Sequence, residues 1–447
     1  MKTARIKENI YGKVLLGAGM LLRLFYVVTS SIYDRQYDIG MISLDAHKPI
    51  TGGHLGYIQY IYEYMKIPDV DPTSIYQFHH PPVHHVISAL WMHFLGLFIH
   101  NNQILEESLQ VIPFICSIIT LVIAYRIIDM TLPEAVGRNA AYAVFSFHPA
   151  LVLLSGSVNN DAMSLCFTFL VIFYALKWAR ETTCKNIVFM AIFLGLGIST
   201  KQNVAECAFF LLPLFIYKLW VSFKEAGAKK LFLEYIVFGI ISIPLGMWFF
   251  IRNLIKYNVS MLWVYDLTED SWQYTGNYPV FNRFFIPDIR EFIDNITHFR
   301  IGCGYNVWIS IMRTSVLGEW DMASTDKKIK ILAVLLMLAG AMVALWAFIY
   351  FLKDVVFGKD FSKPDKIIFV GGYLVTMIFY LSFVYKYPQE CSMNFRYIVA
   401  VLLFQSAALG FIKGDGTNKI IKSVFNITLV IFCLLSVAMI AFWCLFN

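Results

Sequence analysis

A long polar stretch between Tyr33 and Gly96 contains many side chains of types that take part in catalysis, and it directly follows a hydrophobic segment. Aspartate and histidine, which enzymes often use to move protons, recur through it. Three motifs stand out, namely Y-D-R-Q-Y-D-I-G at 33–40, G-G-H-L-G-Y-I at 52–58 and Y-Q-F-H-H-P-P-V-H-H at 76–85. A membrane anchor has no use for such a loop, so the stretch favours an enzyme that works at a membrane surface.

Four more charged residues stand where hydrophobic segments end. Asp161 closes the turn S-V-N-N-D, and Lys201 follows Thr200 at the end of another apolar run. Arg252 closes W-F-F-I-R, and Arg396 lies within N-F-R-Y. Ionisable groups at a boundary between loop and membrane are partly buried, and partial burial is one way in which enzymes tune such groups.

The composition indicates that membrane helices must position these residues. Hydrophobic residues make up 58% of the 447 and charged residues only 15%, and apolar runs of about 20 residues recur, the length that a helix needs to cross a bilayer. The runs are continuous rather than alternating, which argues against a membrane β-barrel. The net charge of +6 is spread over many short loops, as membrane insertion requires, so nucleic acid is not an expected partner.

Eleven apolar segments are predicted to span the membrane, which makes the lipid bilayer an expected partner. They lie near 13–33, 109–127, 139–157, 162–179, 187–200, 204–221, 232–251, 329–352, 367–385, 397–412 and 421–446. The first is interpreted as a retained span with the N-terminus in the cytoplasm. A signal peptide is rejected because Arg23 interrupts the run and no small-residue cleavage site follows it.

Segment 83–99 is ambiguous because it is apolar but carries three histidines. The basic residues decide its interpretation. If the segment does not span, one face of the membrane collects 20 Lys and Arg residues, as the positive-inside rule requires. If it spans, the basic N-terminal cluster falls opposite the others. We therefore predict a helix that begins at Pro81-Pro82 and lies on the outer surface.

The chain is predicted to form a single membrane domain, residues 1–447, with two long loops outside the cytoplasm. The first loop covers 34–110 and the second covers 253–328. No internal repeat stands out. Cys303 and Cys391 both fall outside the cytoplasm in this topology, which permits a disulfide, although the sequence gives no further support for one.

Taken in order, these motifs resemble the GT-C superfamily, the polytopic glycosyltransferases that use polyprenyl-phosphate-linked sugars. The matching features are an aspartate-containing turn after the first span, H-P-P-V opening a surface helix, S-V-N-N-D at 157–161, T-K at 200–201, W-F-F-I-R-N at 248–253 and N-F-R-Y at 394–397. The most similar group is the bacterial branch related to protein O-mannosyltransferases and to the lipid A aminoarabinose transferase. The resemblance implies a GT-C fold and a sugar transferred at the outer face of the plasma membrane.

The resemblance makes Asp38 the candidate general base. Inverting transfer from a lipid phosphate needs a carboxylate that accepts the proton of the attacking hydroxyl group. Many relatives carry two adjacent acids after the first span, whereas Asp38 is followed by Ile39 and Gly40. This departure leaves Asp34 as an alternative base, and either residue is otherwise a solvated loop aspartate.

Arg252, Arg396 and Lys201 are candidates for binding the donor phosphate. Positive donors stabilise the charge that develops on a leaving phosphate, and arginine suits bidentate contact. Snorkelling at a helix end is the alternative, and it is the stronger one for Lys201. Asp161 is interpreted either as a ligand of the sugar or acceptor or as a helix cap.

His54 and His80 are predicted to contact the substrate, and a turn position explains His54 equally well. No cofactor or metal is predicted, because the histidines near 79–85 lack the cysteine or carboxylate partners that a closed zinc site usually adds; a divalent metal is possible but not indicated. Arg23 lies mid-span, where a charge usually faces a protein interior, so a structural role is expected.

A transporter, or a flippase for the lipid carriers of envelope glycans, is the alternative function. Transporters tend to show internal repeats and broken helices with binding residues near the midplane. Here the polar residues cluster in the outer loops, which favours the enzyme. The sequence does not identify the sugar or the acceptor.

Overall fold

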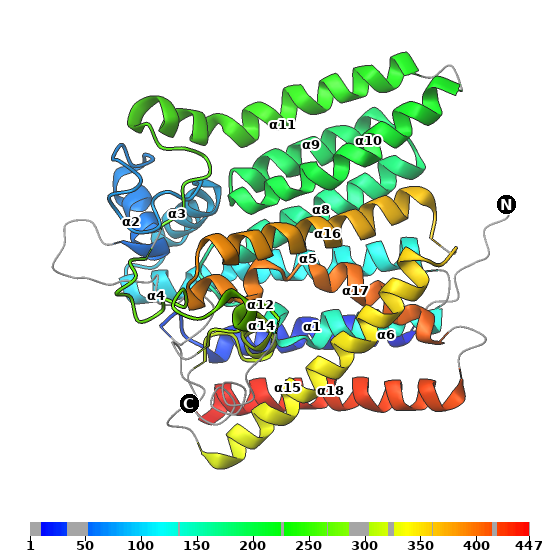
Figure 1. The fold of residues 1–447 in the computed structure, drawn as a ribbon. Coiled ribbons are helices and arrows are strands. Elements are labelled where there is room, and N and C mark those ends of the chain that lie inside the picture. The colour runs from blue at the N-terminus through cyan, green and yellow to red at the C-terminus, as the bar shows by residue number, and fades with distance from the viewer. Residues whose placement is uncertain are drawn as a thin grey trace.

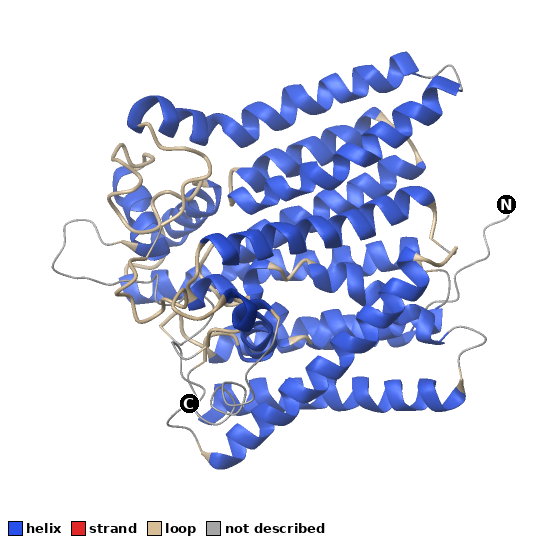
Figure 2. Ribbon diagram, in the orientation of Figure 1, coloured by secondary structure: helices blue, strands red, loops and turns tan. Residues whose placement is uncertain are grey.

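The computed structural model describes residues 10–33, 52–132, 135–224, 228–265, 267–285, 304–320, 326–359, 361–413 and 418–446. Over these residues the regular structure is helical, and the β-type pairing among them is an isolated bridge between Tyr274 and Gln389. Figure 2 shows the helices running roughly parallel in one bundle.

Eight helical stretches of the described residues are long and apolar enough to cross a membrane. They contain α1 (Ile10–Thr29), α5 (Val111–Thr131), α8 (Asp161–Arg180), α10 (Glu206–Lys224), α11 (Ala228–Tyr257), α15 (Lys327–Tyr350), α16 (Lys363–Lys386) and α18 (Lys419–Phe446). The other three expected spans correspond to shorter helices, which are α6 (Ala135–Phe147) continued by α7 (Pro149–Leu153), α9 (Cys184–Ile198) and α17 (Val401–Leu409). The all-α, multi-pass class is confirmed, and the count of eleven stays a prediction.

Three short helices gather at one end of the bundle, which we call the loop end (Figure 1). They are α2 (Gly53–Tyr64), α3 (Val83–Gly96) and α4 (Asn102–Glu107). α1 begins at the opposite end, where α10 also connects to α11 and α15 to α16. α3 starts directly after its N-cap Pro82 and packs on α2. Segment 83–99 thus contains a short helix that packs at the loop end, and its position at the membrane surface stays a prediction.

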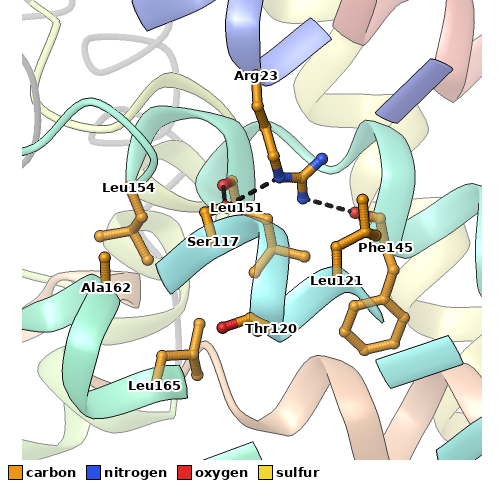
Figure 3. Close-up of a pocket in the computed structure, with 9 residues that line it drawn as sticks. All are labelled: Arg23, Ser117, Thr120, Leu121, Phe145, Leu151, Leu154, Ala162 and Leu165. Atoms are coloured by element: carbon orange, nitrogen blue, oxygen red, sulfur yellow. Dashed lines mark hydrogen bonds between the residues drawn. The ribbon is translucent and has the colours of Figure 1, made fainter. Parts of the chain in front are cut away.

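A break between α6 and α7 explains the charge inside the first span. Pro149 opens α7, and a proline has no N–H group to donate to the carbonyl four residues earlier, that of Phe145. Arg23 supplies the missing donor, with its Nη2 atom 2.8 Å from the carbonyl oxygen of Phe145 (Figure 3). The same guanidinium donates to the carbonyls of Ser146 and Gly19 and to the hydroxyl of Ser117. Arg23 therefore has a structural role.

The packing of α8, α9 and α11 fixes the geometry at the loop end. Gly195 of α9 lies so close to α11 that an added Cβ atom would come within 2.6 Å of the Cβ atom of Leu245. Small residues permit this close approach between membrane helices. α8 begins at the loop end with Asp161, α9 ends shortly before Lys201, and α10 begins with Glu206, so three helix ends meet there.

Candidate active site at the loop end of the bundle

The turn before α8 places the carboxylate of Asp161 without using it as a cap. The backbone N–H of Asp161 donates to Oδ1 of Asn159 at 2.9 Å, so Asn159 satisfies an unpaired group of the helix terminus. The side chain of Asn160 donates to the carbonyl of Thr200 at 3.1 Å, which ties the turn to the end of α9. Asp161 is buried. Helix capping therefore does not account for its side chain.

Two cations contact Asp161 from distant parts of the sequence. Nζ of Lys201 pairs with Oδ1, and Nη1 of Arg396 lies 3.4 Å from Oδ2. Lys201 and Arg396 are 7% and 8% exposed, so Lys201 does not snorkel to the surface. The ion-pair cluster of these three side chains holds one more positive than negative charge. A buried positive excess is a suitable binding site for an anion.

Tyr397 joins both cations, although the sequence did not single out its side chain. Its ring centroid lies 5.2 Å from Nζ of Lys201 and 5.0 Å from the guanidinium carbon of Arg396, distances typical of cation–π contacts. Nη2 of Arg396 also donates to the Tyr397 hydroxyl at 3.1 Å. Asn394 accepts from the Arg396 backbone and donates to Glu319. The N-F-R-Y motif was the available signal for these neighbours.

Asp161 and Arg396 line a cavity of about 40 Å³ between α8, α10, α16 and α17. The wall nearest these two residues includes Tyr397 and Ser164, and the rest is a mixture of polar and apolar groups. The remaining lining residues are Leu154, Leu165, Thr168, Asn203, Glu206, Cys207, Phe210, Thr376, Val399, Ala400 and Phe404. Polar groups that converge beside apolar ones are typical of small-molecule sites.

The predicted histidines stack against one another beside this site. His54 lies in α2, and its Nδ1 atom is 2.9 Å from Nε2 of His85 at the start of α3. Its ring also stacks on His80, with ring centroids 5.3 Å apart. Burial lowers the pKa of His80 well below its ordinary value, and the positive charge of Lys201 lowers it further. His54, His80 and His85 form the histidine stack, and its His80 end lies within the electrostatic reach of Lys201.

His80 and His85 of the histidine stack remain neutral over the physiological pH range. Burial and the neighbouring imidazoles lower the pKa of His85 well below its ordinary value, and burial lowers that of His84 to about 3. Among the described residues, no group of three or more histidine, cysteine, aspartate or glutamate side chains is arranged to hold a metal ion. Neutral imidazoles donate and accept single hydrogen bonds, a property that suits contact with sugar hydroxyls.

Arg252 lies apart from the lining of the cavity. At the loop end of α11, its Nη2 atom donates to the carbonyl of Pro68 at 2.6 Å and to Oδ1 of Asp69 at 3.2 Å. Hydrogen bonds from Lys256 and Tyr257 to the same carboxylate lower the pKa of Asp69 to about 2. Arg252 thus connects the first long loop to α11, while Arg396 and Lys201 meet at Asp161.

Asp34 and Asp38 lie outside the described residues, as does Cys303. Tyr33 and Gly53, which lie just before and just after residues 34–51, make contacts at the loop end. The hydroxyl of Tyr33 donates to Glu106 of α4, and the N–H of Gly53 donates to the carbonyl of Tyr76.

Comparison with known proteins gives one family match. Residues 79–248 match the model of the family described as dolichyl-phosphate-mannose-protein mannosyltransferase, a range that contains His80, Asp161 and Lys201. No curated protein matches the chain.

Two solved membrane proteins are similar over most of this chain. The oligosaccharyltransferase of Archaeoglobus fulgidus, in the apo form, is 13% identical with a TM-score of 0.47, over 97% of this chain and 56% of that one. ArnT from Cupriavidus metallidurans, in the apo state, is 13% identical with a TM-score of 0.43, over 97% and 77%. ArnT bound to undecaprenyl phosphate is 14% identical with a TM-score of 0.41, over 89% and 77%. The chain thus spans about half the length of the oligosaccharyltransferase.

Proposed function

We propose that the chain is a membrane glycosyltransferase of the GT-C superfamily, which the family match over residues 79–248 supports, and that it transfers a sugar from a polyprenyl-phosphate donor. The acceptor is a protein, a lipid or a glycan of the cell envelope. The transfer takes place at the extracytoplasmic face, which in this proposal is the loop end of the bundle.

The observation that carries the proposal is the buried ion-pair cluster of Asp161, Lys201 and Arg396. Its excess positive charge suits the phosphate of the donor, and the same charge stabilises that phosphate as it leaves. Asp161 holds the two cations in place before the donor binds. The donor lipid then extends along the apolar part of the cavity, which lies among membrane helices.

The remaining roles follow the chemistry of inverting transfer. Asp38 accepts the proton of the acceptor hydroxyl as the oxygen attacks the anomeric carbon, and Asp34 is the alternative base. His54 and His80 donate or accept hydrogen bonds to the sugar from the side of the histidine stack. Arg252 is a second arginine for the donor phosphate, and it must exchange its contact with Asp69 to reach it.

A cell-free transfer assay tests the proposal. Purified protein in nanodiscs is incubated with a panel of labelled polyprenyl-phosphate sugars, and envelope extract supplies the acceptor. We expect at least one sugar to move to the extract, and we expect Arg396→Lys, which keeps the charge, to slow the transfer at low donor concentration. If no donor is used, while the protein moves labelled carrier lipid across proteoliposomes, the flippase alternative replaces the enzyme.

A further inference from the structure

Glu206 is a second carboxylate on the wall of the cavity that Asp161 and Arg396 line. It is the first residue of α10. A short 3₁₀ turn, Gln202–Ala205, carries the chain to it from Lys201. The chain therefore places a carboxyl group on the cavity wall shortly after Lys201, which pairs with Asp161 of the same wall.

The carboxylate of Glu206 differs from that of Asp161 in its partners. Asp161 pairs with two cations, whereas in the described part of the chain no hydrogen bond or ion pair reaches the side chain of Glu206. It lies within a segment that is long and apolar enough to span the membrane. An ionisable residue in such a segment is costly, and it usually serves a substrate when it faces a cavity.

Helix capping and internal hydrogen bonds do not occupy this side chain. An acidic residue is favourable at a helix N-terminus. The backbone N–H of Glu206 donates to carbonyls of the 3₁₀ turn, so this group does not need the side chain as a partner. The hydroxyls of Ser164 and Thr168, which line the same cavity, donate to carbonyls of their own helix. The carboxyl group of Glu206 is therefore available for hydrogen bonds with a molecule in the cavity.

We propose that Glu206 accepts hydrogen bonds from hydroxyl groups of the donor sugar and so determines which sugar is transferred. This inference rests on the proposed function. With the phosphate at Lys201 and Arg396, the sugar attached to that phosphate occupies the same cavity. The carboxyl oxygens of glutamate accept hydrogen bonds, and each sugar hydroxyl has a proton to donate. Glu206 is thus a specificity-determining residue.

Deoxygenated donors test this assignment. A site built to hydrogen-bond a hydroxyl rejects the analogue that lacks it, because leaving the buried partner unsatisfied corresponds to about tenfold in kcat/KM. We expect the wild type to lose at least about tenfold in kcat/KM when one particular hydroxyl is removed. For Glu206→Ala, removal of the same hydroxyl is expected to cost less than about threefold, because its partner is already absent.

Three controls keep the outcomes separate. Glu63→Ala removes an exposed carboxylate of α2 and should keep the wild-type response to every deoxy sugar. Binding of sugar-free polyprenyl phosphate should be the same for Glu206→Ala and the wild type.

If Glu206→Ala lowers the melting temperature and keeps the full wild-type response to deoxygenation, the residue is structural and the inference is wrong. If the wild type transfers no sugar from any donor, the proposed function itself fails.

Discussion

At the scale of residues, the side chain of Asp161 forms ion pairs instead of capping its helix. Asn159 accepts the backbone N–H of Asp161, and the carboxylate pairs with Lys201 and Arg396. Breaking such a buried cluster by removing one partner leaves an uncompensated charge and is strongly destabilising. Conservative replacements that keep the charge therefore give the cleanest tests.

Arg396→Lys is expected to raise KM for the donor by about tenfold, because lysine lacks the planar fork that binds phosphate in a bidentate way. Initial rates at varied donor concentration measure the effect. Arg252→Lys is the matched comparison, and we expect a smaller change because Asp69 already engages that guanidinium. Equal effects of the two variants would contradict the central place given to Arg396.

Asp38→Asn is expected to lower kcat by at least about 100-fold, the lower end for general-base catalysis, while donor binding stays nearly normal. Asparagine keeps the size of the side chain but does not accept a proton at neutral pH. Single-turnover transfer separates the chemical step from binding. Near-normal turnover of Asp38→Asn, with Asp34→Asn inactive, moves the base to Asp34. Near-normal turnover of both removes the mechanism.

At the scale of residues, the sequence indicated which side chains could be functional but not which of them contact one another. The helix-end positions of Asp161, Lys201 and Arg396 were readable from hydropathy. Their contact was not, because it depends on how the ends of α8 and α9 and the segment before α17 pack. The sequence did not predict Glu206 as a site residue, because it lies at the start of an apolar run with no motif around it.

At the scale of elements, α2 and α3 form a small unit held together by buried aromatic rings. Tyr57 of α2 stacks on His85 of α3, with ring centroids 4.2 Å apart. His84 is buried beside them, in edge contact with His54 and His85. Neutral histidines pack here as aromatic side chains, and protonation would place charge in a buried site.

We expect the protein to lose stability as the pH falls below about 6.5, the ordinary value for histidine. The folded state lowers the pKa of His84 to about 3, so below pH 6.5 the unfolded chain binds a proton that the folded chain does not. The contribution of His84 is thus complete above pH 6.5 and declines as the pH falls towards 3. Melting temperatures between about pH 5 and pH 8 should show the slope, which is at most about 1.4 kcal/mol per pH unit for one proton.

The variant His84→Gln should show a shallower slope, because glutamine does not titrate. His100→Gln replaces an exposed histidine and should keep the wild-type slope. Equal slopes for all three proteins would show that the burial of His84 does not govern the acid response.

At the scale of the whole molecule, the direction of each helix decides which residues share a side of the membrane. Alternation of the helices brings α2, α3 and the ion-pair cluster to the loop end (Figure 1). The positive-inside rule predicted that segment 83–99 lies on the same side as the second long loop, because charge counts sum over many loops. Its position at the membrane surface stays a prediction. Hydropathy left the number of spans unsettled, because α9 and α17 are shorter than a full crossing.

Thiol labelling tests the orientation. Native Cys184 is exposed at the start of α9, and Asn101 is exposed at the start of α4. In intact cells, an impermeant maleimide should label Asn101→Cys from outside and should reach Cys184 only after the membrane is opened. Labelling of both positions from the same side would contradict the topology.

The most direct measurement of the central claim follows both products of one reaction. Purified protein is given a polyprenyl-phosphate sugar of known anomeric configuration together with an acceptor, and the released lipid phosphate and the transferred sugar are quantified. We expect one polyprenyl phosphate for each sugar transferred and a product anomer opposite to that of the donor. A product that retains the donor's configuration would contradict the inverting mechanism with an aspartate base. Absence of lipid phosphate release with every donor would contradict the transferase itself.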